Sequence, residues 1–329
     1  MYKKIIYTFF LLAFSVLIFG IATKQALAFA VSPVVIEHEL APGMSATGKI
    51  RVTNTQEDSA RHYVFAQKFV PVGEEGRQQY IEPEDDITNF SQWFDINNTS
   101  YVIDAKSTEE IEYTITVPPN AEPGGHYGAL FVSLDPPDLE SEESGASLSS
   151  NTGILFLIRI AGDIFENATV ESFDTNQKIF SHLPANFSLR LRNEGNVHFR
   201  PKGTMEIRNM WGSIVARVPA NPRNSAVLPN SIRRINTWWA KTNELAQGGF
   251  TAGLINEWNN FGLGRYTAAV NVKYGTENKN LEPVETSFWV IPWRMILILA
   301  VFLITLFIVM KIYNKAIVSS AIKKSNKKK

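Results

Sequence analysis

The feature that most constrains the fold of this chain is an alternation of apolar and polar residues with a period of two. The stretch 111–117 places Ile, Tyr, Ile and Val on one face and Glu and Thr on the other, and the stretch 187–192 repeats the pattern with Phe and Leu against Ser and Arg. Successive side chains of a β-strand point to opposite faces, so each stretch is typical of a strand with one buried face. Many such short strands, separated by turn sequences such as PPN at 118–120, predict an all-β protein built of sandwiches.

A weak internal repeat indicates two copies of one kind of domain. Residues 49–55 (KIRVTNT) resemble residues 188–194 (SLRLRNE), and each is a strand that ends in an Asn-led turn. A glycine that precedes an aromatic strand follows later in both halves, at 125–132 and at 264–270. We therefore expect two tandem immunoglobulin-like antiparallel β-sandwiches.

The domain limits follow from length and from the apolar strands. The two sandwiches are predicted at 29–166 and 167–290, each large enough to fold around its own core without the disulfides that this cysteine-free chain lacks. The acidic, Ser-rich stretch 135–152 is interpreted as a long hairpin loop of the first domain. The reason is that the apolar strand at 153–160 behind it is needed to complete the sheet of that domain.

The N-terminal end has the pattern of a secretory signal. Lys3 and Lys4 precede an apolar segment at 5–21, and Ala-Leu-Ala at 26–28 matches a cleavage site. Residues 1–28 are therefore predicted to be a signal peptide. If this segment stayed uncleaved, the chain would cross the membrane twice with the same domains outside.

The C-terminal end has the pattern of a membrane anchor. No charged residue interrupts 295–310, and seven lysines without any acidic residue follow it. This pattern predicts a transmembrane helix at 291–313 and a Lys-rich cytoplasmic tail at 314–329, with the sandwiches outside the cytoplasmic membrane. A buried core helix is the alternative for the same apolar run.

The apolar run alone is short for a bilayer, because 16 residues span about 24 Å against about 30 Å of hydrocarbon. Snorkelling of Arg294 and Lys311 is expected to make up the difference. The predicted anchors at the two membrane interfaces are Trp289, Trp293, Arg294, Lys311 and Tyr313.

The net charge of zero hides a strong asymmetry. All 32 acidic residues fall in 29–290, together with only 21 basic ones. The net charge of this region is therefore 21 minus 32, or −11. Such a surface is repelled by nucleic acid, so a nucleic-acid partner is not expected. The expected partners are a cell-wall glycan or envelope and surface proteins, together with the lipid bilayer through the C-terminal helix.

Aromatic residues divide into predicted core anchors and a predicted surface. Buried aromatic residues are the usual anchors of a sandwich core, a role expected for Trp93, Tyr113 and Tyr127. Trp238 and Trp239 are neighbours on a strand, so only one of them can face the core. Trp239, with Trp258 and Phe261 of the turn-rich stretch 248–264, is predicted to form a surface that binds a sugar or a protein.

Catalytic and metal-binding patterns are not found in the sequence. The five histidines never have the spacing H-x-x-x-H or H-E-x-x-H, and the acidic cluster at 82–86 does not match an EF-hand loop. No G-x-S-x-G, Walker or dinucleotide fingerprint occurs. We therefore predict no catalytic residues, no metal site and no cofactor.

Several short motifs resemble one known family. They are SP at 32–33, VTN at 52–54, SQWF at 91–94, ITVP at 115–118 and PGGHYG at 123–128. This layout is similar to that of the bacterial surface proteins with a DUF916 domain, also called WxL-interacting proteins. The resemblance implies a signal peptide, two immunoglobulin-like domains, a C-terminal membrane helix and a short basic tail.

The function that this resemblance implies is non-catalytic. Such a protein would be anchored in the membrane and would recognise a cell-wall polymer or partner surface proteins. One alternative is a periplasmic-chaperone-like role, in which similar sandwiches shield or assemble other secreted proteins. A more remote alternative is an ectoenzyme, which would need polar residues that converge in a deep pocket.

Overall fold

The computed structural model describes residues 28–82, 85–86, 88–136, 151–242 and 244–326. The predicted signal segment lies outside the described residues except for Ala28, and so does most of the predicted hairpin loop. The described chain forms two compact units. The first comprises the described chain as far as Phe69, with Tyr80–Ala121 and His126–Ile158, and the second comprises Val70–Gln79, Glu122–Gly125 and the described chain from Arg159 onward.

Two sheets, built mostly from residues of the first unit, have an immunoglobulin-like strand order. The strands of one sheet follow the order β1-β3-β8-β6, and those of the other follow β2-β10-β9-β4-β5, with β7 beside β4. In immunoglobulin lettering these are A-B-E-D and A′-G-F-C-C′. The strands are β1 (Phe29–Ser32), β2 (Val35–Leu40), β3 (Ser45–Asn54), β4 (Ala60–Val72), β5 (Arg77–Tyr80), β6 (Phe94–Ile96), β7 (Ser100–Ile103), β8 (Thr108–Thr116), β9 (Gly124–Ser133) and β10 (Thr152–Ile160).

Aromatic rings from both sheets form the core of the first unit. Tyr113 on β8 meets Phe156 on β10 edge to face, with ring centroids 5.1 Å apart. Trp93, in the short 3-10 helix η2 (Phe90–Trp93), and Tyr127 on β9 are buried as well. The alternation of β8 is the cause, since Ile111, Tyr113 and Ile115 face inward while the residues between them do not. Each fully buried side chain of this size contributes about 1.5–3 kcal/mol.

β10 follows β9 in the chain and is also its neighbour in the sheet. β10 lies between β2 and β9 in the second sheet of the first unit, so the stretch after β9 connects neighbouring strands of one sheet. The chain passes into the second unit between Ile158 and Arg159. The limit predicted at 166/167 lies a few residues later, in the segment between β10 and β11.

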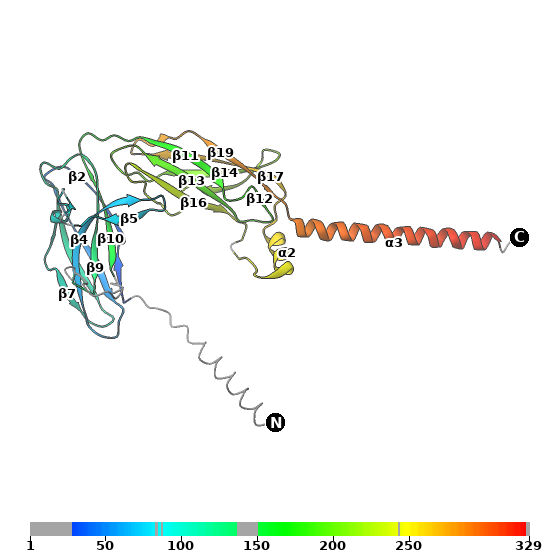
Figure 1. Cartoon of the computed structure of the whole chain (residues 1–329), viewed down its shortest axis with the longest axis horizontal. Helices are drawn as coiled ribbons and strands as arrows, with labels where there is room; N and C mark the ends of the chain where they lie inside the picture. The colour runs from blue at the N-terminus through cyan, green and yellow to red at the C-terminus, as the bar shows by residue number, and fades with distance from the viewer. Residues whose placement is uncertain (1–27, 83–84, 87, 137–150, 243, 327–329) are drawn as a thin grey trace, which may run out of the picture. The chain divides into compact units, whose positions relative to one another are not determined.

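The second unit has the same strand order as the first, except that its described residues contain no counterpart of β6. Its sheets have the orders β11-β13-β16 and β12-β19-β17-β14-β15, with β18 beside β17, which correspond to A-B-E and A′-G-F-C-C′. Among the described residues of this unit, the strand pairs are antiparallel except for β12 with β19, which is parallel. The strands are β11 (Ala168–Thr175), β12 (Ile179–Phe180), β13 (Ala185–Asn193), β14 (Lys202–Asn209), β15 (Ile214–Pro219), β16 (Ser231–Trp239), β17 (Gly264–Tyr274), β18 (Lys279–Asn280) and β19 (Val284–Val290). The chain is therefore a pair of immunoglobulin-like β-sandwiches followed by a helix (Figure 1).

The Asn-led turns of the internal repeat are equivalent in the two units. Asn193 ends β13, is buried, and donates from Nδ2 to the carbonyls of Val197 (2.8 Å) and Val227 (2.9 Å). Asn54 ends β3, is buried, and donates in the same way to Asp58 (2.8 Å) and Ile103 (3.0 Å). A buried amide with both hydrogens bonded holds a turn that a hydrophobic residue could not, because the carbonyls would lose their donors.

Two helices belong to the second unit. α2 (Gly249–Asn259) occupies the stretch that the sequence predicted as turn-rich and without helix, and that prediction is wrong. α3 (Trp293–Asn326) begins two residues after β19 ends. It contains Trp293–Val318, which is long and apolar enough to cross a membrane. The helix continues beyond the predicted end at Tyr313 into the stretch predicted as a tail.

Candidate functional site

The placement of the two adjacent tryptophans corrects the predicted surface. Trp239 is only 5% exposed, and its ring meets Tyr266 (5.2 Å between centroids) and Phe288 (6.3 Å) in the core. Trp238 is the exposed member of the pair, at 45%. The choice of Trp239 for the surface was therefore wrong. Parity along β16 decides this, because Ile235 and Trp239 are four residues apart and share the inner face.

Trp258 and Phe261 lie where a partner can reach them. Trp258 projects from α2 and is 72% exposed, and Phe261 follows the helix with Lys241 Nζ 6.0 Å from the centre of its ring. At the start of α2, the ring of Phe250 meets that of Trp293 edge to face at 6.1 Å. Phe250 therefore lies beside the beginning of α3, and Trp258 is carried by the helix that packs on α3, while Trp239 is buried in the core.

Amide side chains hold α2 against the loop that precedes it. Asn256 accepts a hydrogen bond from the backbone N–H of Ala246 (2.8 Å) and donates to its carbonyl (3.0 Å). Asn260 accepts from the backbone N–H groups of Lys241 (3.3 Å) and Thr242 (3.1 Å). An 11-residue helix is marginal by itself in water, so these contacts and its packing on α3 stabilise it.

Glu257 joins α2 to the start of α3. Its side chain is fully buried, and its carboxylate accepts hydrogen bonds from Arg294 Nη1 (3.0 Å) and from the backbone N–H groups of Arg294 (3.3 Å) and Met295 (2.9 Å). The first N–H groups of a helix have no partner within the helix, and the helix dipole favours a negative charge there. Glu257 thus caps α3 from a different element of the chain.

The same contact corrects the role predicted for Arg294. Its side chain is 21% exposed, pairs with Glu257 and stacks on Trp293, with 4.5 Å from the guanidinium carbon to the ring centre. Its position also requires Gly253, because a Cβ there would come within 2.4–2.8 Å of the guanidinium. Arg294 is therefore held by protein and does not snorkel. Glu257 is not among the residues predicted from the sequence, because its partner Arg294 lies 37 residues away in the chain.

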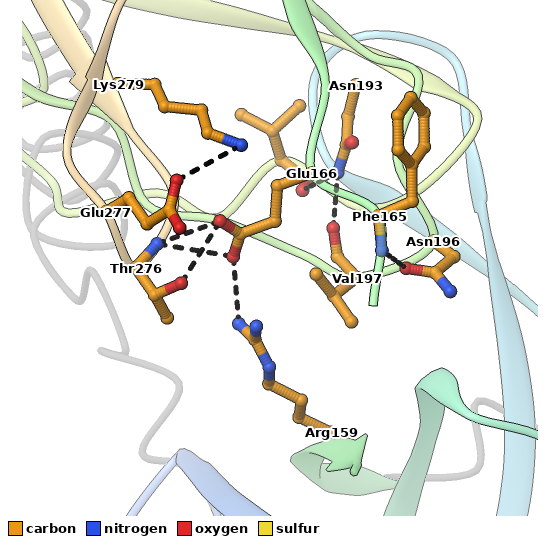
Figure 2. A network of polar contacts seen from close by, with 10 residues as sticks. Arg159, Phe165, Glu166, Asn193, Asn196, Val197, Thr276, Glu277 and Lys279 are labelled. Atoms are coloured by element: carbon orange, nitrogen blue, oxygen red, sulfur yellow. Dashed lines mark hydrogen bonds and ion pairs between the residues drawn. The ribbon is translucent and has the colours of Figure 1, made fainter. Parts of the chain in front are cut away.

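A second buried carboxylate lies at the other end of the strands of the second unit. Figure 2 shows Glu166 between Arg159 and Thr276. Its oxygens accept from Arg159 Nη1 (3.0 Å) and from the backbone N–H (3.0 Å) and hydroxyl (3.2 Å) of Thr276. The backbone N–H of Phe165 donates to Asn196 Oδ1 at 2.8 Å. These bonds fix the segment before β11 to the turn after β17.

The segment Val70–Gln79 is held to the sheet β11-β13-β16 by an ion pair. The carboxylate of Glu74 accepts from Arg190 Nε (2.7 Å) and Nη2 (2.5 Å) and from Arg234 Nη2 (3.1 Å). Its backbone carbonyl also accepts from the backbone N–H of Arg234 at 2.8 Å. The hydrogen bond from Arg190 is the main reason that the pKa of Glu74 lies below its usual value.

No group of three or more potential metal ligands of the His, Cys, Asp and Glu types occurs within the described ranges. The part of the acidic cluster that can be placed has a structural role. Asp86 accepts hydrogen bonds from the hydroxyl of Thr88 (2.6 Å) and the backbone N–H of Phe90 (2.7 Å), which leads into η2. Burial raises the pKa of Asp86, but these bonds and Lys68 outweigh it and lower the pKa overall.

Comparison with known proteins identifies fold relatives only. No family model matches the chain, and no curated protein matches it. A crystal structure of the class 5 fimbriae chaperone CfaA is 13% identical, with a TM-score of 0.37 over 79% of this chain and 98% of its own. The E. coli chaperone DraB is 10% identical, with a TM-score of 0.36 over 80% and 97%. Likeness at this level does not assign a function.

Proposed function

We propose that this chain is a non-catalytic envelope protein, held in the cytoplasmic membrane by α3, whose β-sandwiches bind a partner protein outside. The observation that carries the proposal is the contact between Glu257 and Arg294, which joins the second sandwich directly to the start of an apolar helix. The 26 residues Trp293–Val318 span about 39 Å, more than the roughly 30 Å of hydrocarbon. The lysines that follow favour a cytoplasmic C-terminus.

The edge of the second unit at β15 is the surface that best suits a protein partner. β15 is the last strand of its sheet, and its residues Ile214 and Val215 are 41% and 42% exposed. An extended segment of another protein can add to such an edge through backbone hydrogen bonds, with apolar side chains that select it. Pro219, the last residue of β15, has no N–H, so the edge available for such pairing ends at Val218.

A second candidate function rests on the same edge. An assembly factor that shields the strands of other secreted proteins would also use an open edge strand with exposed apolar residues. The two functions differ in the fate of the partner. A surface receptor retains a folded partner, whereas an assembly factor releases it once it has folded.

The experiment is capture of envelope material by the full-length protein in lipid nanodiscs. Val215→Lys places a charge on the edge and should abolish retention of a protein partner. Val102→Lys, on β7 and 60% exposed, is the matched control and should retain it. Retention of purified peptidoglycan in place of any protein would refute protein recognition, and retention of neither would refute the binding function.

A further inference from the structure

All of the exposed tryptophans gather toward one end of the second unit. The chain has seven tryptophans, and the two that are nearly inaccessible, Trp93 and Trp239, belong to the cores. The other five are 45–78% exposed. They are Trp211 in the turn between β14 and β15, Trp238 near the end of β16, Trp258 on α2, Trp289 near the end of β19 and Trp293 at the start of α3.

The register of the strands places these segments around the start of α3. Gly264, the first residue of β17, pairs with Val290, the last residue of β19, so the loop before β17 lies beside the chain that enters α3. The turn that carries Trp211 reaches the same place, because a Cβ on Gly264 would lie 2.4 Å from the Cε of Met210. α2 itself packs on α3 (Figure 1).

These segments expose apolar side chains at this end of the sandwich. We define the base patch as Met210, Trp211, Phe250, Trp258, Leu263 and Trp293, which are 45–78% exposed. A patch of this kind, rimmed by polar residues, marks a surface that is covered in use. Its continuity with the apolar helix α3 points to the occupant, because the bilayer that holds α3 begins where the patch lies.

The composition of the patch also suits a lipid surface. Tryptophan is enriched at the level of the lipid headgroups, where its ring is partly in apolar surroundings and its N–H can still find a partner. The net charge of −11 on residues 29–290 disfavours attraction to anionic lipids. Contact must therefore come from aromatic and apolar side chains, and it should not require anionic lipid.

We propose that the base patch lies in the interfacial layer of the membrane, so that the second unit rests on the lipid surface beside its own anchor. Trp211 and Trp258 enter the headgroup region from the turn between β14 and β15 and from α2. Trp258 and Leu263 then face lipid and are not a ligand surface. The proposal rests on the proposed insertion of α3.

Because the chain has no cysteine, single cysteines can report the depth of each position. Trp211→Cys, Trp258→Cys, Glu277→Cys and Leu306→Cys would each carry an environment-sensitive fluorophore in the full-length protein, in nanodiscs of zwitterionic lipid. Glu277, whose side chain is 75% exposed, lies in the turn after β17 at the opposite end of the second unit and is the control. Lipids with a shallow spin label should quench the fluorophores at 211 and 258 at least about twofold, and the one at 277 not at all. The fluorophore at 306 should be quenched by deep spin labels.

The outcomes separate the two proposals. If the fluorophore at 306 is quenched while those at 211 and 258 remain as accessible to aqueous iodide as the one at 277, the base patch is in water and the inference is overturned. If 306 is not quenched, α3 is not in the membrane and the proposed function fails with it. A requirement for anionic lipid at 211 and 258 would also overturn the inference, since the contact would then be electrostatic.

Discussion

Replacement of Glu257 by alanine should destabilise the second unit more than any exposed substitution. The side chain of Glu257 is fully buried, and it accepts three hydrogen bonds from Arg294 and Met295. Its loss leaves the guanidinium of Arg294, which is only 21% exposed, without its charge partner. It also leaves two backbone N–H groups at the start of α3 without an acceptor.

The magnitude follows from these two losses. Breaking a buried ion pair from one side costs about 3–5 kcal/mol, and the lower value applies here because Arg294 keeps some contact with solvent. Loss of a helix cap adds about 1 kcal/mol. We therefore expect Glu257→Ala to lower the free energy of unfolding of the second unit by about 4 kcal/mol. Glu257→Gln keeps an acceptor of similar shape and should cost about half as much.

The measurement is denaturant unfolding of the full-length protein in nanodiscs, followed by Trp fluorescence. Glu244→Ala, which removes an exposed acid from the loop before α2, is the control and should change stability by less than about 0.5 kcal/mol. Removing both partners, in Glu257→Gln with Arg294→Met, should recover part of the loss. A cost for Glu257→Ala no larger than that of the control would refute the role assigned to this carboxylate.

Three further outcomes can be checked. A chain that ends at Val290 should melt at a lower temperature than one that ends at Ile298, because the shorter chain leaves Glu257 buried without Arg294. Glu257→Gln should make the difference between the two melting temperatures smaller. Asn193→Ala should cost about 2–3 kcal/mol in urea unfolding, because two buried carbonyls lose their donor. Folding lowers the pKa of the Glu74 carboxyl below 4.5, its value in the unfolded chain. The contribution of this group to stability is therefore present above pH 4.5 and is lost as the pH falls through the pKa of the folded state. The protection factors of the amides in 70–79, which compare the observed exchange rate with the intrinsic rate at the same pH, should therefore fall on acidification, and Glu74→Gln should remove that pH dependence.

Most of the fold is predictable from the alternation of apolar and polar residues, because a strand with one buried face needs an apolar residue at every second position. The strand at 153–160 shows this well: its apolar character required a place in the sheet of the first unit, and β10 occupies that place. The resemblance between 49–55 and 188–194 corresponds to equivalent B strands that end in equivalent buried asparagines. The turn itself needs that amide, so the similarity has a physical cause.

The errors arose where a residue depends on partners far away in the chain. α2 was missed because glycines and asparagines weaken its helical pattern, while contacts with the preceding loop and with α3 stabilise it. The ion pair of Arg294 is not predictable from the sequence, because Glu257 lies 37 residues earlier and gives no local sign of pairing with it. By contrast, the burial of Trp239 in place of Trp238 has a local signal, because Trp239 lies four residues after the apolar Ile235 and so faces the same side of the strand.

By itself, the sequence determined that this chain forms cysteine-free β-sandwiches followed by an apolar helix, since period, turns and hydropathy are local properties. Tertiary structure decided what the helix is attached to and what surrounds its start. Strand register brings Gly264 beside Val290, and a buried carboxylate from α2 caps α3. Both are contacts between residues distant in sequence, and only the folded chain brings them together.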